Sequence, residues 1–271
     1  MGADGGGELA RGVREAYAAR RDAEDRPSAS GRGAAVQSFI VMEMMKEAMA
    51  LEREGAEVMH LEVGQPSTGA PRRAIEAAQQ ALASGAPLGY TVAAGMPELR
   101  ARLARHYRDT HGVDVEPERI IVTAGSTGAF TLVFLAAFSS GDRVAVTQPG
   151  YPCYTNILRA LGCEVVPIAV GPSNGFQPSV SDLEAAHRPE EGKPLRGIIV
   201  ASPANPTGVM LSRGRMEGLV NFCDSHGVLY ISDEIYGGLS YASVPGGARR
   251  ECVSALEVER GGSKVGTPIG V

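Results

Sequence analysis

The sequence predicts an α/β fold with three layers, α/β/α, built around a mainly parallel sheet. Two observations predict it: short apolar runs typical of buried strands recur along the chain, and helical patterns lie between most of them. A strand, a helix and a further strand in succession require a crossover, which favours parallel pairing with helices on both faces. The expected strands are residues 120–123, 144–147, 165–170, 197–201 and 228–232.

Proline positions and apolar spacing indicate the helices. Apolar residues recur near helical spacing over residues 36–53. Pro71 suits the first position of a helix that runs to about Ala83. Pro97 opens another helix, which continues through Tyr107. Further helical patterns cover residues 128–138, 152–161 and 213–225.

The two ends of the chain differ from its middle. Residues 1–34 contain Gly-Gly-Gly and Ser-Ala-Ser-Gly-Arg-Gly stretches without apolar periodicity, so we expect a mobile arm there. Residues 259–271 form a Gly-rich tail. The sequence therefore predicts one large domain over residues 35–258, between these two segments.

Composition narrows the classes of protein. Apolar residues make up 44% and charged residues 21% of the chain, as in ordinary globular proteins. The net charge is −5 with both signs scattered, so neither nucleic acid nor a membrane is an expected partner. No apolar run reaches the length of a membrane span, and no secretory pattern opens the chain. We expect a cytoplasmic protein, with organelle import as the alternative that the Arg- and Ala-rich start leaves open.

The four cysteines are widely spaced and include no Cys-x-x-Cys pair, so we expect thiols in a reducing compartment, without disulfides or a metal site. They are Cys153, Cys163, Cys223 and Cys252.

Chemistry in a parallel sheet is expected beyond the carboxyl ends of the strands. Residues 124–128, Ala-Gly-Ser-Thr-Gly, follow the first expected strand and lead into a helix. Small residues let a ligand approach the backbone, a helix start offers free N–H groups to an anion, and Ser126 and Thr127 add hydroxyl donors. This segment is a candidate phosphate site, although any strand-to-helix turn can have this composition.

Three more strand ends carry candidate ligand-binding residues. Tyr151 follows the second strand and offers a flat face to an aromatic ligand, or else caps the core. Asn205 stands between two prolines that stiffen its loop, which makes its amide a rigid donor or part of a plain turn. Asp233 directly follows a buried strand, where a carboxylate needs a partner such as a cationic ring nitrogen, unless it only caps a helix.

In combination, these segments resemble the class I and II aminotransferases of the aspartate aminotransferase fold, which is fold type I of the pyridoxal-phosphate (PLP) enzymes. The resemblance runs from about Gln37 to Val258 and implies that residues 35–258 are a PLP-binding large domain, incomplete at its C-terminus. It also implies a homodimer that acts on an amino acid and a 2-oxo acid. The matching motifs are Leu-Glu-Val-Gly-Gln-Pro (61–66), Gly-Tyr-Thr (89–91), Asn-Pro-Thr-Gly (205–208) and Asp-Glu-Ile-Tyr (233–236).

The resemblance assigns a role to each strand-end residue around PLP. Gly125, Ser126 and Thr127 are expected to hold the cofactor phosphate. Tyr151 is expected to stack on the pyridine ring. Asp233 is expected to act in catalysis by pairing with the ring nitrogen, which keeps the ring protonated as an electron sink.

Further residues are assigned in the same way. Asn205 and Tyr236 are expected to bind the phenolic oxygen of the ring. Tyr90 is expected to reach the phosphate in the other subunit, and Gly64 to lie near the substrate carboxylate.

The family also uses a lysine that binds the cofactor and moves the substrate's proton. Lys264 is the candidate, because it follows Asp233 by 31 positions and Ser263 precedes it. The chain departs from the family here: residues 259–262 are polar and Gly-rich where a buried strand is expected, and only seven residues follow Lys264, so we expect these 271 residues to include no small C-terminal domain.

This departure leaves two hypotheses open. The chain is a PLP-dependent aminotransferase, active or inactivated by the loss of the usual lysine segment. Alternatively, it is a non-catalytic module that binds PLP or pairs with a full-length subunit. A nucleotide-binding α/β protein is disfavoured, because the glycine pattern is wrong and Asn205 and Asp233 would have no role.

Overall fold

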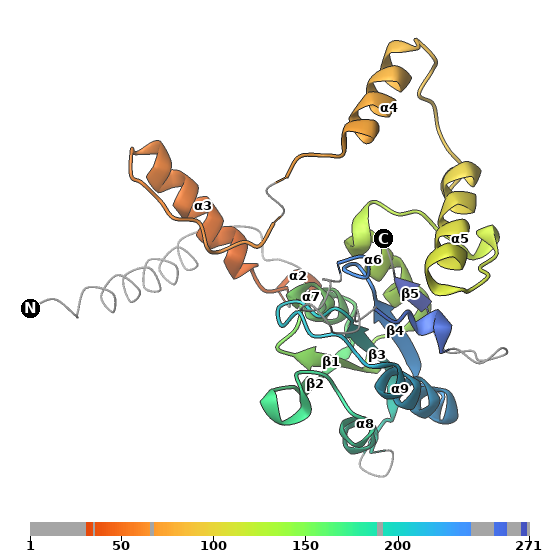
Figure 1. Cartoon of the computed structure of the whole chain (residues 1–271). Coiled ribbons are helices and arrows are strands. Elements are labelled where there is room, and N and C mark those ends of the chain that lie inside the picture. The colour runs from red at the N-terminus through yellow and green to blue at the C-terminus, as the bar shows by residue number, and fades with distance from the viewer. Residues whose placement is uncertain are drawn as a thin grey trace, which may run out of the picture.

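A computed structural model describes residues 31–34, 36–65, 68–188, 192–239, 252–258 and 267–269. Its centre is a sheet of five strands in the order β2-β1-β3-β4-β5, and every described pairing is parallel (Figure 1). The predicted parallel sheet is therefore confirmed. The strands are β1 (Arg143–Gln148), β2 (Glu164–Ala169), β3 (Leu195–Ala201), β4 (Leu229–Asp233) and β5 (Thr267–Ile269).

Five of the described α-helices precede β1, and one α-helix lies between each two successive strands from β1 to β4. The described α-helices are α2 (Gly31–Ala34), α3 (Ile40–Arg53), α4 (Arg72–Ala83), α5 (Pro97–His111), α6 (Gly125–Ala137), α7 (Pro152–Ala160), α8 (Val180–His187) and α9 (Arg213–His226). Three short 3₁₀ helices are η1 (Pro117–Arg119), η2 (Pro172–Asn174) and η4 (Ala255–Glu257).

Alternate residues of the central strands enter two separate cores, one on each face of the sheet. In β3, Ile198 packs with Leu183 of α8 and Met216 of α9, whereas Ile199 packs with α6 and α7. β4 repeats the alternation, with Tyr230 in the first core and Ile231 in the second. Because successive side chains of a strand point to opposite faces, this pattern gives the predicted three-layer α/β/α arrangement.

The N-terminal helices α3 and α4 contain no buried residue. Figure 1 shows both helices lying away from the sheet, joined to it through extended segments. Their apolar side chains, among them Ile40 and Leu82, are largely exposed. The amphipathic spacing that predicted these helices is present, but within the described chain it has no core to face.

The prediction of a strand over residues 120–123 was wrong. This segment pairs with no described strand, and the Val122 N–H donates instead to the Ala94 carbonyl at 2.9 Å. Gly95 makes that approach possible, because a Cβ there would lie 2.6 Å from the Cβ of Val122. The apolar pattern thus reflects packing against the turn before α5 and not membership of the sheet.

Element boundaries differ slightly from the expected ones. Pro71 is the residue that caps α4 and does not stand inside it, and α5 continues past Tyr107 to His111. α6 begins at Gly125, three residues before the expected start at Gly128. The helix α8 was not among the predicted elements, although Ser179 and Asp182 form a capping box at its start.

The ends of the chain are described only in part. Residues 1–30, most of the predicted arm, and Lys264 lie outside the described residues. Within the tail, residues 267–269 form β5 and pair with Ile231, Ser232 and Asp233 of β4. No helix in the described ranges has the length and apolarity needed to cross a bilayer.

Candidate active site

The carboxyl ends of β3 and β4 lie in register and form the floor of the candidate site. Ala201 is paired with Asp233, and the Ser202 N–H donates to the Asp233 carbonyl at 3.0 Å. Asp233 stands two residues after Ile231, and Ile231 belongs to the core shared with α6 and α7. The period-two alternation of a strand therefore directs the Asp233 side chain towards those two helices.

The Asp233 carboxylate is buried and held at both oxygens. Its residue is 3% exposed. The hydroxyl of Tyr154 donates to Oδ2 in a very short hydrogen bond, and the Ile235 N–H donates to Oδ1 at 3.1 Å. Burial raises the pKa of Asp233 above its ordinary value, and the two hydrogen bonds oppose the rise. Both partners are neutral, so the described residues leave a buried carboxylate that favours a cationic ligand.

Asp233 was also considered as a helix cap. The chain after β4 makes a turn over residues 235–238 and not a helix. The bond from the Ile235 N–H is the kind that an aspartate makes within such a turn. The turn accounts for the hydrogen bond at Oδ1. It does not account for the burial of the carboxylate or for the bond from Tyr154 at Oδ2.

The start of α6 presents backbone donors beside this carboxylate. Gly125 adopts φ +74°, and Ala124 before it provides no side-chain cap, so the first N–H groups of the helix are without a capping side chain. Thr123 shapes the turn by donating from Oγ1 to the Gly125 carbonyl at 2.8 Å. Such a helix start attracts anions.

Thr127 connects the α6 start to α7. The Cys153 thiol lies 3.8 Å from Thr127 Oγ1, and Thr127 lies close enough to Tyr151 to influence the pKa of its hydroxyl. Burial raises the pKa of Tyr151, with smaller contributions from the nearby Cys153, Tyr236 and Asp233. Thr127, Tyr151, Tyr236 and Asp233 are therefore neighbours.

Asn205 lies half-buried in the loop after β3. The loop is closed by the Gly208 N–H, which donates to the Ala204 carbonyl at 2.7 Å, and by the Ala204 N–H, which donates to the Val209 carbonyl at 3.0 Å. Within the described residues the Asn205 amide makes no side-chain hydrogen bond of its own, which leaves it open to a ligand.

Two predicted residues are not brought to this cluster. Tyr90 stands in the segment between α4 and α5 and is fully exposed, at 109%. Gly64 is exposed as well, and a Cβ placed there would meet no atom within 4 Å. Both were assigned to substrate or to a second subunit, and neither assignment is tested by a single chain.

Tyr154 is a residue of the site that sequence reasoning missed. It lies one helical turn after Tyr151, at the start of a helix that Pro152 opens. That spacing places the two rings on the same side of α7, a signal that was available. The two rings are in edge contact, with centroids 5.5 Å apart.

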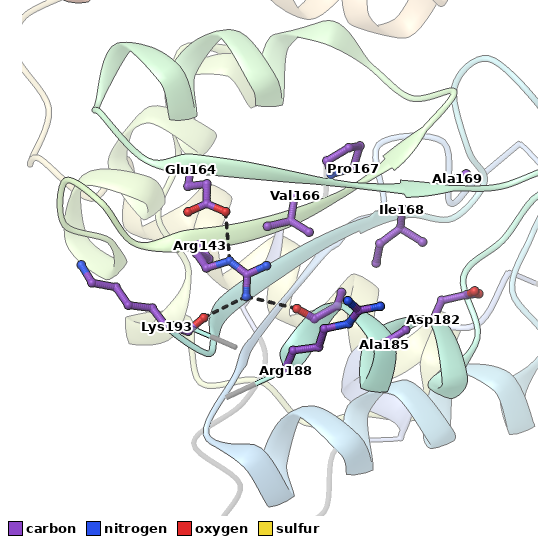
Figure 2. A pocket seen from close by; sticks show the side chains of 12 residues that line it. Arg143, Glu164, Val166, Pro167, Ile168, Ala169, Asp182, Ala185, Arg188 and Lys193 are labelled. Carbon is purple, nitrogen blue, oxygen red and sulfur yellow. Dashed lines mark hydrogen bonds and ion pairs between the residues drawn. The ribbon is translucent and has the colours of Figure 1, made fainter. Parts of the chain in front are cut away.

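A separate cavity lies away from this cluster. It measures about 600 Å³ and is formed by the edge strand β2 and the helix α8. Figure 2 shows Arg143 there, bonded to Glu164 and to the carbonyls of Ala186 and Lys193. None of the residues predicted to bind a ligand lines this cavity.

All four cysteines are free and buried in the structure.

The residues present fit a cofactor with a phosphate and a protonated aromatic ring. The uncapped α6 start suits the phosphate, the half-buried Tyr151 ring suits the aromatic plane, and Asp233 is a buried carboxylate with only neutral partners. Among the described residues no group of three or more His, Cys, Asp or Glu side chains could hold a metal ion.

Comparisons with known proteins identify the family. A family model for aminotransferases of class I and II matches residues 56–262, and the chain therefore belongs to this family, whose members are PLP-dependent. The chain is 47% identical over 212 residues to the valine–pyruvate aminotransferase of Mycobacterium tuberculosis, covering 78% of this chain and 53% of that protein.

Solved structures agree in fold. An aminotransferase from Mycobacterium tuberculosis matches with a TM-score of 0.77 and 44% identity, over 86% of this chain and 57% of that chain. The aspartate aminotransferase of Thermus thermophilus with maleate matches with a TM-score of 0.76 and 32% identity. The match covers 86% of this chain and 58% of that chain. The chain thus spans about half the length of the relatives that it matches.

Proposed function

We propose that this chain is the cofactor-binding part of a PLP-dependent aminotransferase, which transfers an amino group between an amino acid and a 2-oxo acid. The observation that carries the proposal is the buried Asp233 carboxylate at the end of β4, among neighbours that include Tyr151, Tyr236 and Thr127. The family membership and the names of the relatives support the reaction class.

Each group in the cluster has a separate task in this proposal. The N–H groups and hydroxyls of Gly125, Ser126 and Thr127 hold the phosphate at the start of α6. Tyr151 lies against the ring face. The Asp233 carboxylate accepts a hydrogen bond from the protonated ring nitrogen. The cofactor, when bound, supplies an electron sink for the bond that breaks at the substrate's α-carbon.

Asp233 works through the electrostatics of burial. A carboxylate in a site of low polarity interacts strongly with a cation, because water does not screen the pair. The same burial makes the ionised carboxylate unfavourable when no cation is present, which is the direction of its pKa shift. Asp233 therefore favours the protonated ring over the neutral one.

The remaining assignments complete the proposal. Asn205 and Tyr236 donate to the phenolic oxygen of the ring. Lys264 holds the cofactor and moves the proton at the α-carbon, although it lies outside the described residues. Gly64 adjoins the substrate carboxylate, and Tyr90 reaches the site of a second subunit in a homodimer.

The experiment that tests this proposal is chemical mapping of the cofactor. The chain is incubated with PLP, reduced with borohydride, and digested for mass spectrometry, with Lys264→Ala as the control. We expect a pyridoxyl group on Lys264 that the control lacks, together with a visible absorption band before reduction. Label on no specific lysine of a folded chain contradicts the enzymatic proposal. Saturable PLP binding without label points instead to the non-catalytic module.

A further inference from the structure

Tyr154 touches both the carboxylate and the aromatic platform of the candidate site. Its hydroxyl donates to Asp233 Oδ2, and its ring meets the Tyr151 ring edge-on. The Tyr154 ring also contacts the Phe130 ring, with the ring centroids 4.9 Å apart and an interplanar angle of 72°. Tyr154 is 3% exposed, so these contacts leave its ring with little freedom to move.

The two hydrogen bonds to Asp233 determine the plane of its carboxylate. Oδ2 receives the Tyr154 hydroxyl and Oδ1 receives the Ile235 N–H. Each carboxylate oxygen can accept about two hydrogen bonds, so each retains a free acceptor position. The orientation of those free positions is set from both sides, and a ligand meets a carboxylate that is already oriented.

Tyr230 shows that burial of a tyrosine does not by itself produce such a bond. It lies on β4, three residues before Asp233, and is 0% exposed. Its hydroxyl has no hydrogen-bond partner among the described residues. Its side chain belongs to the core on the opposite face of the sheet from Tyr154. The bond between Tyr154 and Asp233 is therefore specific to the face of the sheet that α6 and α7 cover.

We propose that Tyr154 is a positioning residue, whose hydroxyl orients the Asp233 carboxylate towards the ring nitrogen of the cofactor and keeps it ionised. This inference rests on the proposed function. It deepens that function by adding a residue that acts through Asp233 and does not itself touch the reacting atoms.

The surroundings of Asp233 make this hydroxyl important. Among the residues that the structure describes, the titratable groups that face it are Tyr154, Tyr151 and Cys153, and none of these is a cation. Burial raises the pKa of Asp233, and the Tyr154 hydroxyl is the largest influence that lowers it. The pKa of Tyr154 is itself raised, by burial first and then by the charge of Asp233, so its proton stays on the hydroxyl.

The test compares Tyr154→Phe with Tyr230→Phe in the full chain without cofactor. Both variants delete one buried hydroxyl, but only the first deletes a bond to Asp233. The ionisation of Asp233 is followed by NMR of ¹³C-labelled aspartate, with Asp233→Asn used to assign the signal. We expect the midpoint pH of the Asp233 titration to rise in Tyr154→Phe and to stay at the wild-type value in Tyr230→Phe.

The second readout is the affinity for PLP, measured by equilibrium dialysis from pH 6 to pH 9. Loss of a hydrogen bond to a charged group predicts about tenfold weaker binding for Tyr154→Phe. The loss should grow towards acid pH, where the variant's Asp233 takes up a proton. Tyr230→Phe should bind as the wild type does.

The outcomes separate the two proposals. An unchanged Asp233 midpoint in Tyr154→Phe, with wild-type PLP binding intact, overturns the role of Tyr154 alone. Failure of the wild-type chain to bind PLP overturns the proposed function itself. If Tyr154→Phe does not fold, 3-fluorotyrosine at position 154 replaces it. Its more acidic hydroxyl should strengthen the bond and lower the Asp233 midpoint, and an unchanged midpoint counts against the inference.

Discussion

The imidazole Nδ1 of His111 lies 2.8 Å from Oε1 of Glu257, which links the end of α5 to a segment 146 residues further along the chain. Both side chains are largely buried, at 14% and 13% exposure. Arg213 at the start of α9 also donates to Glu257, and the Ser254 N–H donates to it at 2.9 Å. Glu257 therefore ties residues 252–258 to two helices.

Replacing Glu257 with Gln should destabilise the fold by about 2 kcal/mol, because a charged acceptor with three donors is lost. Burial raises the pKa of Glu257, but the bonds from Ser254, His111 and Arg213 outweigh burial and bring that pKa below its ordinary value. A lowered pKa contributes stability that is present above the unfolded-state pKa and lost as pH falls through the folded-state pKa. Urea unfolding at pH 7 and at pH 4 should therefore show a smaller difference from wild type at pH 4.

The control for Glu257 is Glu217→Gln on the exposed side of α9. It should change the free energy of unfolding by less than about 0.5 kcal/mol at either pH. Equal losses for the two variants would contradict the role of Glu257 as a tie between segments.

Replacing Asp233 with Asn should affect stability and cofactor binding in opposite ways. Burial raises the pKa of Asp233, so the protonated carboxyl stabilises the fold below the unfolded-state pKa, and this contribution is lost as pH rises through the folded-state pKa. At pH 7 the neutral amide avoids that cost, and we expect the melting temperature without cofactor to be equal to or above that of wild type. PLP binding should weaken at least about tenfold. A marked fall in melting temperature would instead assign Asp233 a structural role.

Replacing Gly95 with Ala should damage the turn before α5. Gly95 has φ +95°, and an added Cβ would lie 2.6 Å from Val122 Cβ, so strain and a clash combine to about 3 kcal/mol. Gly85→Ala is the matched control, because Gly85 has φ +69° but an added Cβ there meets no atom within 4 Å. It should cost only about 1 kcal/mol of backbone strain. Similar losses of unfolding free energy would contradict the close packing of the turn on residues 120–123.

Replacing Tyr230 with Phe should leave the fold as stable as before or raise its stability by about 1 kcal/mol, because the hydroxyl is buried without a described partner. Tyr154→Phe should lower stability relative to Tyr230→Phe at pH 7, since it removes a bond to a buried carboxylate. Thermal unfolding of the two variants side by side measures the difference. A Tyr230→Phe protein that is the less stable of the two would reveal a bond at Tyr230 that the structure does not show.

Much of the fold could be predicted from local patterns. Pro97 and Pro152 begin helices as expected, because proline lacks the N–H that a helix start does not need. The apolar runs at residues 144–147, 165–170, 197–201 and 228–232 all became strands. In β1, β3 and β4 most residues of these runs are buried, as expected for strands covered on both faces, whereas β2 at the sheet edge is mostly not buried. Residues 120–123 have a similar composition but remain outside the sheet, because strand formation depends on a neighbouring strand that the pattern does not contain.

The sequence by itself determined the layered fold, which follows from spacing along the chain, and the family, which follows from the resemblance of its motifs. Only the tertiary structure decided which residues meet. Asp233 and Tyr154 are 79 positions apart, and their bond exists because β4 directs every second side chain towards α7. Contacts of that kind depend on how helices lie on a sheet, and no periodicity within a single segment contains that information.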